Sequence, residues 1–164
     1  ESLKTESEIQ SICNSFIEAK GSMFLGRGYS FPIALEGALK LKELAYVHAE
    51  GYPAGEMKHG PLALIEDGMP VVVLAPKDTY YKKTISNMQE VIARGAKVLL
   101  ITNKSKDEVY SENIWQTIEV ENTSEDLFPF LVTVPLQKLA YYSALKKGYD
   151  IDKPRNLAKS VTVE

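Results

Sequence analysis

The chain has 164 residues, of which 45% are hydrophobic and 25% charged, and its formal net charge is −3 at pH 7. These values are typical of one globular domain that is long enough to bury a core. The negative charge argues against a nucleic-acid partner, because proteins that bind nucleic acid normally carry a basic patch or stripe.

Cys13 is the single cysteine, so an internal disulfide is excluded, and the sequence offers no Cys/His cluster for a metal ion. A single unpaired cysteine is consistent with a reducing compartment, the cytoplasm. Cys13 lies in the apolar segment SICNSFI, where a core residue is a better interpretation than a nucleophile. The longest apolar segment, LFPFLVTVPL, is too short to span a membrane, and no signal segment precedes it, so we expect no membrane partner.

The first predicted elements are a helix, a strand and a second helix. Residues 5–21 have apolar residues at helical spacing, and Thr5 with Glu8 matches a capping box, which predicts a helix that starts there. The apolar segment SMFLG at 22–26 predicts a strand. The turn GRG follows it, and a second helix is expected to open near Pro32.

Three further strands alternate with two helices in the second half of the chain. The runs PVVVLAP (70–76) and KVLLITN (97–103) are typical of strands buried on both faces, and WQTIEVEN (115–122) predicts another strand. Helices are expected at 80–95 and at 124–148, the second in spite of its prolines.

This alternation predicts an α/β fold in which helices cover both faces of a parallel sheet. We expect a doubly wound, flavodoxin-like three-layer αβα sandwich. Such sheets bind ligands beyond the carboxyl ends of their strands. The GRG turn and the charged segment that follows it are expected in that region.

The predicted second helix carries charge in an apolar setting. Glu36, Lys40 and Glu43 share a sector of about 60° between two apolar sides, so we expect this sector to be partly covered. Glu36 and Lys40 could form an ordinary ion pair one turn apart. Alternatively, Lys40 and Glu43 could form an acid–base pair that lines a cleft. The pattern alone favours the ordinary ion pair.

Both histidines of the chain follow this charged sector. His48 falls on the broad apolar face of the predicted helix, which favours a core or helix-end histidine over a catalytic one. His59 precedes Gly60 and Pro61, in a loop that cannot continue a helix. The pattern leaves two interpretations of His59 open, a proton carrier at neutral pH and a residue that caps a turn.

The end of the sequence, RNLAKSVTVE, places Arg155 and Lys159 among short side chains. A solvated, frayed terminus is one interpretation. The other is a lysine held against the domain, where desolvation lowers its pKa so that the neutral amine can attack a carbonyl carbon.

Two long segments, ALEGALKLKELAYVHAEGYPAGEMKHGPLALI and DKPRNLAKSVTVE, closely resemble the C-terminal sugar isomerase (SIS) domain of the glutamine–fructose-6-phosphate aminotransferase (isomerizing) family. The resemblance covers residues 22–164 and overturns the ordinary ion-pair interpretation. It implies a five-stranded SIS fold with a short strand at 48–54. It also implies one SIS domain over residues 1–164, in which 150–164 form a catalytic tail.

The same resemblance implies a larger parent enzyme that consists of a glutaminase domain and two SIS domains. This chain would be the second SIS domain, would end at the C-terminus of the enzyme and would act in a homodimer. The parent converts fructose 6-phosphate and glutamine-derived ammonia to glucosamine 6-phosphate, and no cofactor is implied.

Four catalytic roles are carried over by motif. Lys159 would form the Schiff base with the open-chain keto sugar phosphate, and Glu43 would move a proton between C1 and C2. Lys40 would assist proton transfer at the sugar hydroxyls. His59 would promote ring opening in the active site of the neighbouring subunit. Three residues are expected to support the site: Glu36, which orients Lys40, and Arg155 and Ala158 in the tail.

A phosphate cradle is missing from the predicted turns GRGYS, PKDTYY and NKSKDE, none of which is rich in serine and threonine. The resemblance implies that the first SIS domain supplies it, so we expect the isolated chain to turn over little or no substrate. Two alternatives remain: another SIS phosphosugar isomerase or deglycase, and a non-catalytic SIS domain that senses a sugar phosphate. An enzyme of the first class would not be expected to share the ending RNLAKSVTVE. A sensor of the second class would have no chemical reason to carry the four catalytic side chains.

Overall fold

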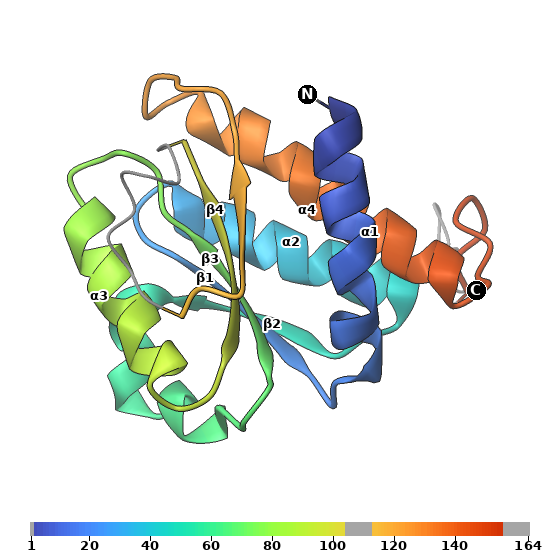
Figure 1. Cartoon of the computed structure of the whole chain (residues 1–164), viewed down its shortest axis with the longest axis horizontal. Helices are drawn as coiled ribbons and strands as arrows, with labels where there is room; N and C mark the ends of the chain where they lie inside the picture. Colours follow the sequence, from blue (N-terminus) through green and yellow to red (C-terminus); the bar gives the residue numbers. More distant parts are fainter. Residues whose placement is uncertain (1, 104–112, 156–164) are drawn as a thin grey trace, which may run out of the picture.

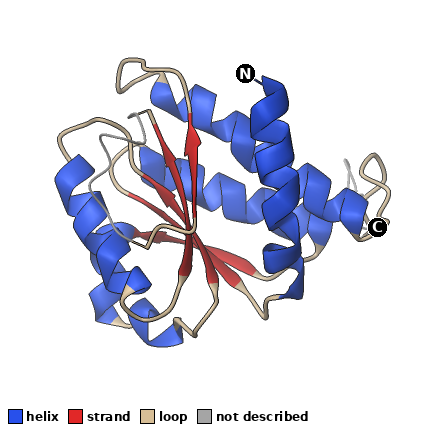
Figure 2. Cartoon of the chain, viewed as in Figure 1, coloured by secondary structure: helices blue, strands red, loops and turns tan. Residues whose placement is uncertain are grey.

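The computed structural model describes residues 2–103 and 113–155, which fold around one parallel sheet (Figures 1 and 2). The sheet has five strands in the order β2-β1-β3-β4-β5, and every neighbouring pair is parallel. This is the flavodoxin-like order, so the predicted fold class is confirmed. The strands are β1 (Ser22–Gly26), β2 (Ala49–Pro53), β3 (Pro70–Leu74), β4 (Lys97–Thr102) and β5 (Gln116–Glu119).

Helices cover both faces of this sheet in two unequal layers. The helices are α1 (Ser2–Glu18), α2 (Ser30–Ala45), α3 (Tyr81–Ile92) and α4 (Phe128–Lys146), with the 3-10 helices η1 (Ala54–His59) and η2 (Pro61–Leu64). Figure 1 shows α1, α4 and α2 on one side of the strands and α3 with the short 3-10 segments on the other.

Each layer has its own hydrophobic core, as expected for a sheet that is apolar on both faces. Phe24 and Leu41 lie in the core shared by the sheet with α1, α2 and α4. Met57 of η1 and Met88 of α3 lie in the core on the opposite face. Strands β1 and β3 are buried along their whole length because they sit in the middle of the sheet. Cys13 is fully buried, which agrees with its interpretation as a core residue.

Two glycines fix the position of α2. A Cβ atom on Gly26 would lie 2.3 Å from the carbonyl oxygen of Ser30, so the turn from β1 into α2 requires glycine. A Cβ atom on Gly37 would lie 3.0 Å from side-chain atoms of Leu136 and Phe24. The small residue at 37 therefore lets α2 pack closely on both α4 and the sheet.

Two boundaries differ from the sequence predictions. Helix α1 begins at Ser2, so the cap expected at Thr5 is wrong and Thr5 lies inside the helix. Helix α2 ends at Ala45, because Tyr46 adopts a left-handed conformation with φ 52°. His48 therefore leaves the helical register, and of the two places expected for it, the core or the helix end, the core is wrong. Its side chain is 66% exposed and lies 3.3 Å from a carboxylate oxygen of Glu50.

Helix α4 forms across both of its prolines, as predicted. Pro129 occupies the first turn, where its missing N–H costs nothing, and Pro135 is buried inside the helix. None of the helices within residues 2–103 and 113–155 is long and apolar enough to cross a membrane.

Candidate active site

The charged sector of α2 forms a compact three-residue ion cluster. The Lys40 ammonium lies 2.6 Å from Oε2 of Glu43 and 3.5 Å from Oε1 of Glu36. The side chains of Lys40 and Glu43 are only 29% and 26% exposed, and that of Glu36 is 41% exposed. The expectation that this sector is partly covered is confirmed.

The cluster determines the charge state of its lysine. The hydrogen bond to Glu43, and the negative charge of Glu36, raise the pKa of Lys40 above its ordinary value against the opposing effect of burial. Lys40 is therefore an ammonium at neutral pH. A fixed ammonium donates hydrogen bonds and stabilises a developing oxyanion, but it is not a nucleophile.

The position of the cluster corrects one expectation. The GRG turn lies at the carboxyl end of β1, as predicted, but Glu43 lies 13 residues beyond the start of α2. At the rise of an α-helix this is about 20 Å along the axis, away from the carboxyl edge of the sheet. The Lys40–Glu43 pair therefore lies on the outer helical layer, because α2 runs back along the strands.

Side chains of the two turns border the crevice where the strand order reverses, between β1 and β3. A Cβ atom on Gly28 would lie 3.1 Å from the ring of Tyr80, so the turns that follow these two strands touch each other. Arg27 donates a hydrogen bond of 3.1 Å to the side chain of Asn87 in α3. Its guanidinium also packs against Gly55 of η1. Nearby, burial raises the pKa of Asp78.

The last described residues of the chain meet the end of α2. The backbone N–H of Arg155 donates a hydrogen bond of 2.6 Å to the hydroxyl of Tyr46. The Arg155 guanidinium lies 4.2 Å from the centroid of the Tyr46 ring and 5.8 Å from that of Tyr149. This combination of hydrogen bond and cation–π contact holds residue 155 against Tyr46, which lies three residues after Glu43. Lys159 and Ala158 lie outside the described residues.

His59 lies away from the cluster. It ends η1, which packs with α3 in the core on the other face of the sheet, and its side chain is 76% exposed. The sequence predicted a loop here, and the structure has a 3-10 helix that Gly60 ends with φ 142°. The only charged partner near its ring is Glu56, at 3.9 Å, within the described part of the chain. Since the sheet separates η1 from α2, one chain does not bring His59 to Lys40 and Glu43.

Sequence reasoning missed two residues that build this region. Tyr46 was not singled out from the sequence, yet it ends α2 and binds Arg155. Lys147 donates a hydrogen bond of 2.6 Å to the carbonyl oxygen of Ala45 at the same helix end. Neither role has a local sequence signal, because both contacts join residues about one hundred positions apart.

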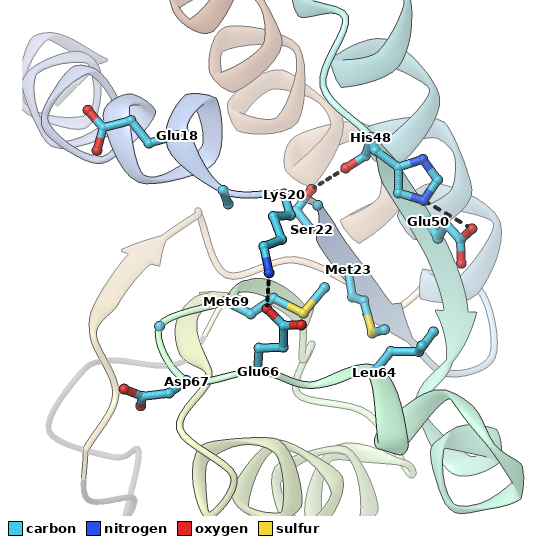
Figure 3. Close-up of a pocket in the computed structure, with 13 residues that line it drawn as sticks. Glu18, Lys20, Ser22, Met23, His48, Glu50, Leu64, Glu66, Asp67 and Met69 are labelled. Carbon is cyan, nitrogen blue, oxygen red and sulfur yellow. Dashed lines mark hydrogen bonds and ion pairs between the residues drawn. The ribbon is translucent and has the colours of Figure 1, made fainter.

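A cavity of about 410 Å³ opens at the amino edge of the sheet and is a different place from the ion cluster (Figure 3). Lys20 and Glu66 form an ion pair of 3.3 Å across it, and His48 with Glu50 lines one side. Both members of the Lys20–Glu66 pair are largely exposed, so solvent screens their interaction. Within the described ranges, no three His, Cys, Asp or Glu residues group closely enough to hold a metal ion.

Comparison with known protein families identifies the class of this domain. The family model of the SIS domain matches residues 15–147, so the chain belongs to the SIS domain family. Over all 164 residues it is 53% identical to the glutamine–fructose-6-phosphate aminotransferase (isomerizing) of Bartonella henselae and 51% identical to that of Aquifex aeolicus. It spans only 27% and 28% of the length of those two relatives.

Solved structures give the same assignment. The C-terminal domain of glucosamine-fructose-6-phosphate aminotransferase from Francisella tularensis superposes with a TM-score of 0.87 at 46% identity, over 92% of this chain and 42% of that one. The glucosamine-6-phosphate deaminase of Thermotoga maritima matches with a TM-score of 0.73 at 28% identity, over 98% of this chain and 46% of that one. A tagatose-6-phosphate ketose/aldose isomerase from Escherichia coli, 22% identical with a TM-score of 0.73, shares the fold over 96% of this chain and 47% of its own length.

Proposed function

We propose that this chain is the second SIS domain of a glutamine–fructose-6-phosphate aminotransferase and carries the side chains that convert fructose 6-phosphate and ammonia to glucosamine 6-phosphate. The observation that carries the proposal is the half-covered Lys40–Glu43 pair, which lies one helical turn from the anchoring point of Arg155. Similarity above 50% to such aminotransferases along the whole chain supports it.

The anchored end of the described chain gives Lys159 access to the cluster. Lys159 is the fourth residue after Arg155, and an extended chain of four residues spans at most about 14 Å. Tyr46, which holds Arg155, lies three residues after Glu43. We infer that a lysine on such a short tether is within reach of the Glu43 carboxylate.

The chemistry requires the amine of Lys159 to condense with the C2 carbonyl of the open-chain sugar and release water. Ammonia then replaces the lysine at C2. Glu43 removes a proton from C1 and returns one to C2, so that C1 becomes the aldehyde and C2 carries the amine. Lys40, held as an ammonium, stabilises the negative charge that develops on the C1 oxygen, and Glu36 orients it. Arg155 and Ala158 position the tail.

His59 fits this scheme as a residue that serves the neighbouring subunit of a homodimer. Its side chain is exposed and lies on the other face of the sheet from Glu43. In a two-fold dimer, a residue on one side of each chain can complete the site of its partner. Its task there is to transfer the proton that opens the sugar ring.

The phosphate group of the substrate needs a cradle from elsewhere in the parent protein. Tyr80 and Arg27 lie at the two turns of the switch point, and neither turn is rich in serine and threonine. We therefore assign phosphate binding to a first SIS domain and ammonia release to a glutaminase domain of a cytoplasmic parent. The isolated chain is then expected to convert fructose 6-phosphate to glucose 6-phosphate slowly or not at all.

Borohydride reduction of the full-length protein in the presence of fructose 6-phosphate tests the proposal. We expect the sugar to be trapped on Lys159, as read by peptide mass spectrometry. Stable labelling of a different lysine would defeat the assigned role of Lys159. Robust turnover of fructose 6-phosphate by the 164-residue chain would refute the need for a first SIS domain.

The similarity to a glucosamine-6-phosphate deaminase supports a second candidate function. In that case the parent would be a SIS enzyme that acts on the amino group of a sugar phosphate without using glutamine. Glutamine dependence separates the two. An aminotransferase forms glucosamine 6-phosphate from glutamine, whereas a deaminase or deglycase releases amine from its substrate. Binding of a sugar phosphate without any turnover in the full-length protein would instead indicate a sensor.

A further inference from the structure

One ion pair joins helix α3 to the segment that carries His59. Nζ of Lys58, the residue before His59 in η1, lies 3.0 Å from Oε1 of Glu90 in α3. The Lys58 side chain is 64% exposed, whereas that of Glu90 is only 21% exposed, so the lysine reaches over a carboxylate that is set into the domain. Because the lysine is exposed to solvent, the pair contributes little to the stability of the fold.

The Glu90 carboxylate is not explained by stability. Its second oxygen, Oε2, is buried and makes no hydrogen bond to any described residue. A buried carboxylate oxygen without a hydrogen bond destabilises a fold, and an apolar side chain at this position would avoid that cost. The neighbouring residues Met88 and Val91 are fully buried apolar residues of this kind. The contact that the charge of Glu90 does make is the one with Lys58.

Two further contacts hold the rest of η1 on the same helix. Gly55 lies against the guanidinium of Arg27, which donates a hydrogen bond of 3.1 Å to the side chain of Asn87 in α3. Met57 is fully buried in the core that also contains Met88 of α3. Together with the ion pair, these contacts hold η1 at its start, its middle and its end.

The ring of His59 is exposed although the segment that carries it is held. The side chain is 76% exposed and lies 3.9 Å from Oε2 of Glu56. Gly60 follows with φ 142°, a conformation that residues with a Cβ atom rarely adopt, so the chain leaves η1 in a geometry specific to glycine. A side chain that projects into solvent from an anchored backbone suits a task outside its own domain.

We propose that Glu90, acting through Lys58, is a positioning residue for His59, a statement that rests on the proposed function. By fixing the end of η1, it sets where the His59 ring stands in the site of the neighbouring subunit. During ring opening the C2–O5 bond of the sugar breaks, O5 takes up a proton from the histidine, and the hydroxyl on C2 loses its proton as the carbonyl forms. A proton carrier must lie within about 3 Å of the atom it serves, and a displacement of about 1 Å can slow a reaction by about 10²-fold.

Combination with a His59 variant tests the proposal in the full-length protein, with formation of glucosamine 6-phosphate from glutamine as the readout. Glu90→Gln keeps the shape of the side chain and removes its charge. We expect it to lower kcat about tenfold and to change KM less than about twofold, since Glu90 does not touch the sugar. In the His59→Asn background, which has no ring to position, Glu90→Gln should cause no further loss. A further loss of about tenfold in that background overturns the proposal.

A substrate that has no ring gives a second readout. 5-Deoxyfructose 6-phosphate lacks the hydroxyl that closes the sugar ring, so it is an open-chain ketone in solution. We expect Glu90→Gln and His59→Asn to convert it at rates within about twofold of the wild-type rate, although both variants convert fructose 6-phosphate slowly. Equal losses with the two sugars would mean that Glu90 acts on the fold of the domain or on a later step, and would overturn the proposal.

Three further variants complete the test. Lys58→Arg keeps the ion pair and should retain the wild-type kcat, whereas Lys58→Met should reproduce the loss seen with Glu90→Gln. Glu66→Gln, the matched control, breaks the exposed pair with Lys20 at the amino edge of the sheet and should leave kcat unchanged. An active wild-type protein whose Glu90→Gln variant is fully active refutes the positioning role alone. A wild-type protein that forms no glucosamine 6-phosphate refutes the proposed function, and the positioning role with it.

Discussion

On one face of the sheet, three long helices carry an ion cluster and the contact that anchors Arg155. The opposite face is covered by α3 and two short 3-10 helices, and there His59 stands exposed next to Glu56. The residues expected to act together are therefore divided by the sheet. The difference indicates that a chain of this fold holds parts of two sites rather than one complete site, and that assembly with other domains or copies joins them.

The largest expected effect tests the face of the sheet that α1, α2 and α4 cover. Glu43→Gln removes the base while keeping the shape of the side chain, and we expect synthesis of glucosamine 6-phosphate by the full-length protein to fall by about 10²- to 10⁴-fold. Glutamine hydrolysis, measured as glutamate release, should persist. Loss of both activities would point to a folding defect, and Glu66→Gln, whose side chain is 69% exposed at the amino edge of the sheet, serves as the matched exposed control.

Subunit mixing tests whether the two faces meet between chains. We expect His59→Asn alone to lower activity by about 10²-fold, since a proton carrier is lost. When His59→Asn and Glu43→Gln proteins are unfolded and refolded together, half of the dimers are mixed and each mixed dimer has one intact site, which gives about a quarter of wild-type activity. Activity no higher than that of the separate variants would place His59 and Glu43 in the site of a single chain.

A smaller effect concerns the anchor between α2 and the chain end. Tyr46→Phe removes the acceptor of the Arg155 N–H hydrogen bond but keeps the ring beneath the guanidinium. A neutral hydrogen bond contributes about 0.5–1.5 kcal/mol, so we expect amide exchange at Arg155 and tryptic cleavage after it to become about two- to tenfold faster. Tyr141→Phe, at an exposed position of α4, is the control that should leave both rates unchanged.

The smallest effect tests the electrostatics of the cluster. We expect Lys40→Met to lower the free energy of unfolding of the 164-residue chain by about 0.2–1 kcal/mol at neutral pH, since the ion pair is partly exposed. The pKa of Lys40 is raised in the folded chain, so this stabilisation is fully present below the unfolded value of about 10.4 and is lost as the pH rises through the higher folded value. Urea titrations at neutral and strongly alkaline pH measure the difference. A difference that grows with pH would contradict the assignment, and Lys42→Met is the exposed control.

The strands and most helices could be predicted because their signals are local. Continuous β-branched runs produced β3 and β4 almost at their observed bounds, and the apolar segment at 22–26 matched β1. The end of α2 could not be predicted, since a left-handed tyrosine has no sequence signature and is held by contacts with residues far along the chain.

The sequence by itself determined the order of the elements, the family and the spacing that puts Glu36, Lys40 and Glu43 on one sector of a helix. Hydrophobic periodicity and side-chain spacing act within a few residues, so they can be read along the chain. Only the tertiary structure decided that this sector faces outward beside α4, that Arg155 is held at the end of the same helix, and that His59 lies across the sheet. Those relations depend on how separate elements pack, and a packing contact between distant residues leaves no periodic trace in the sequence.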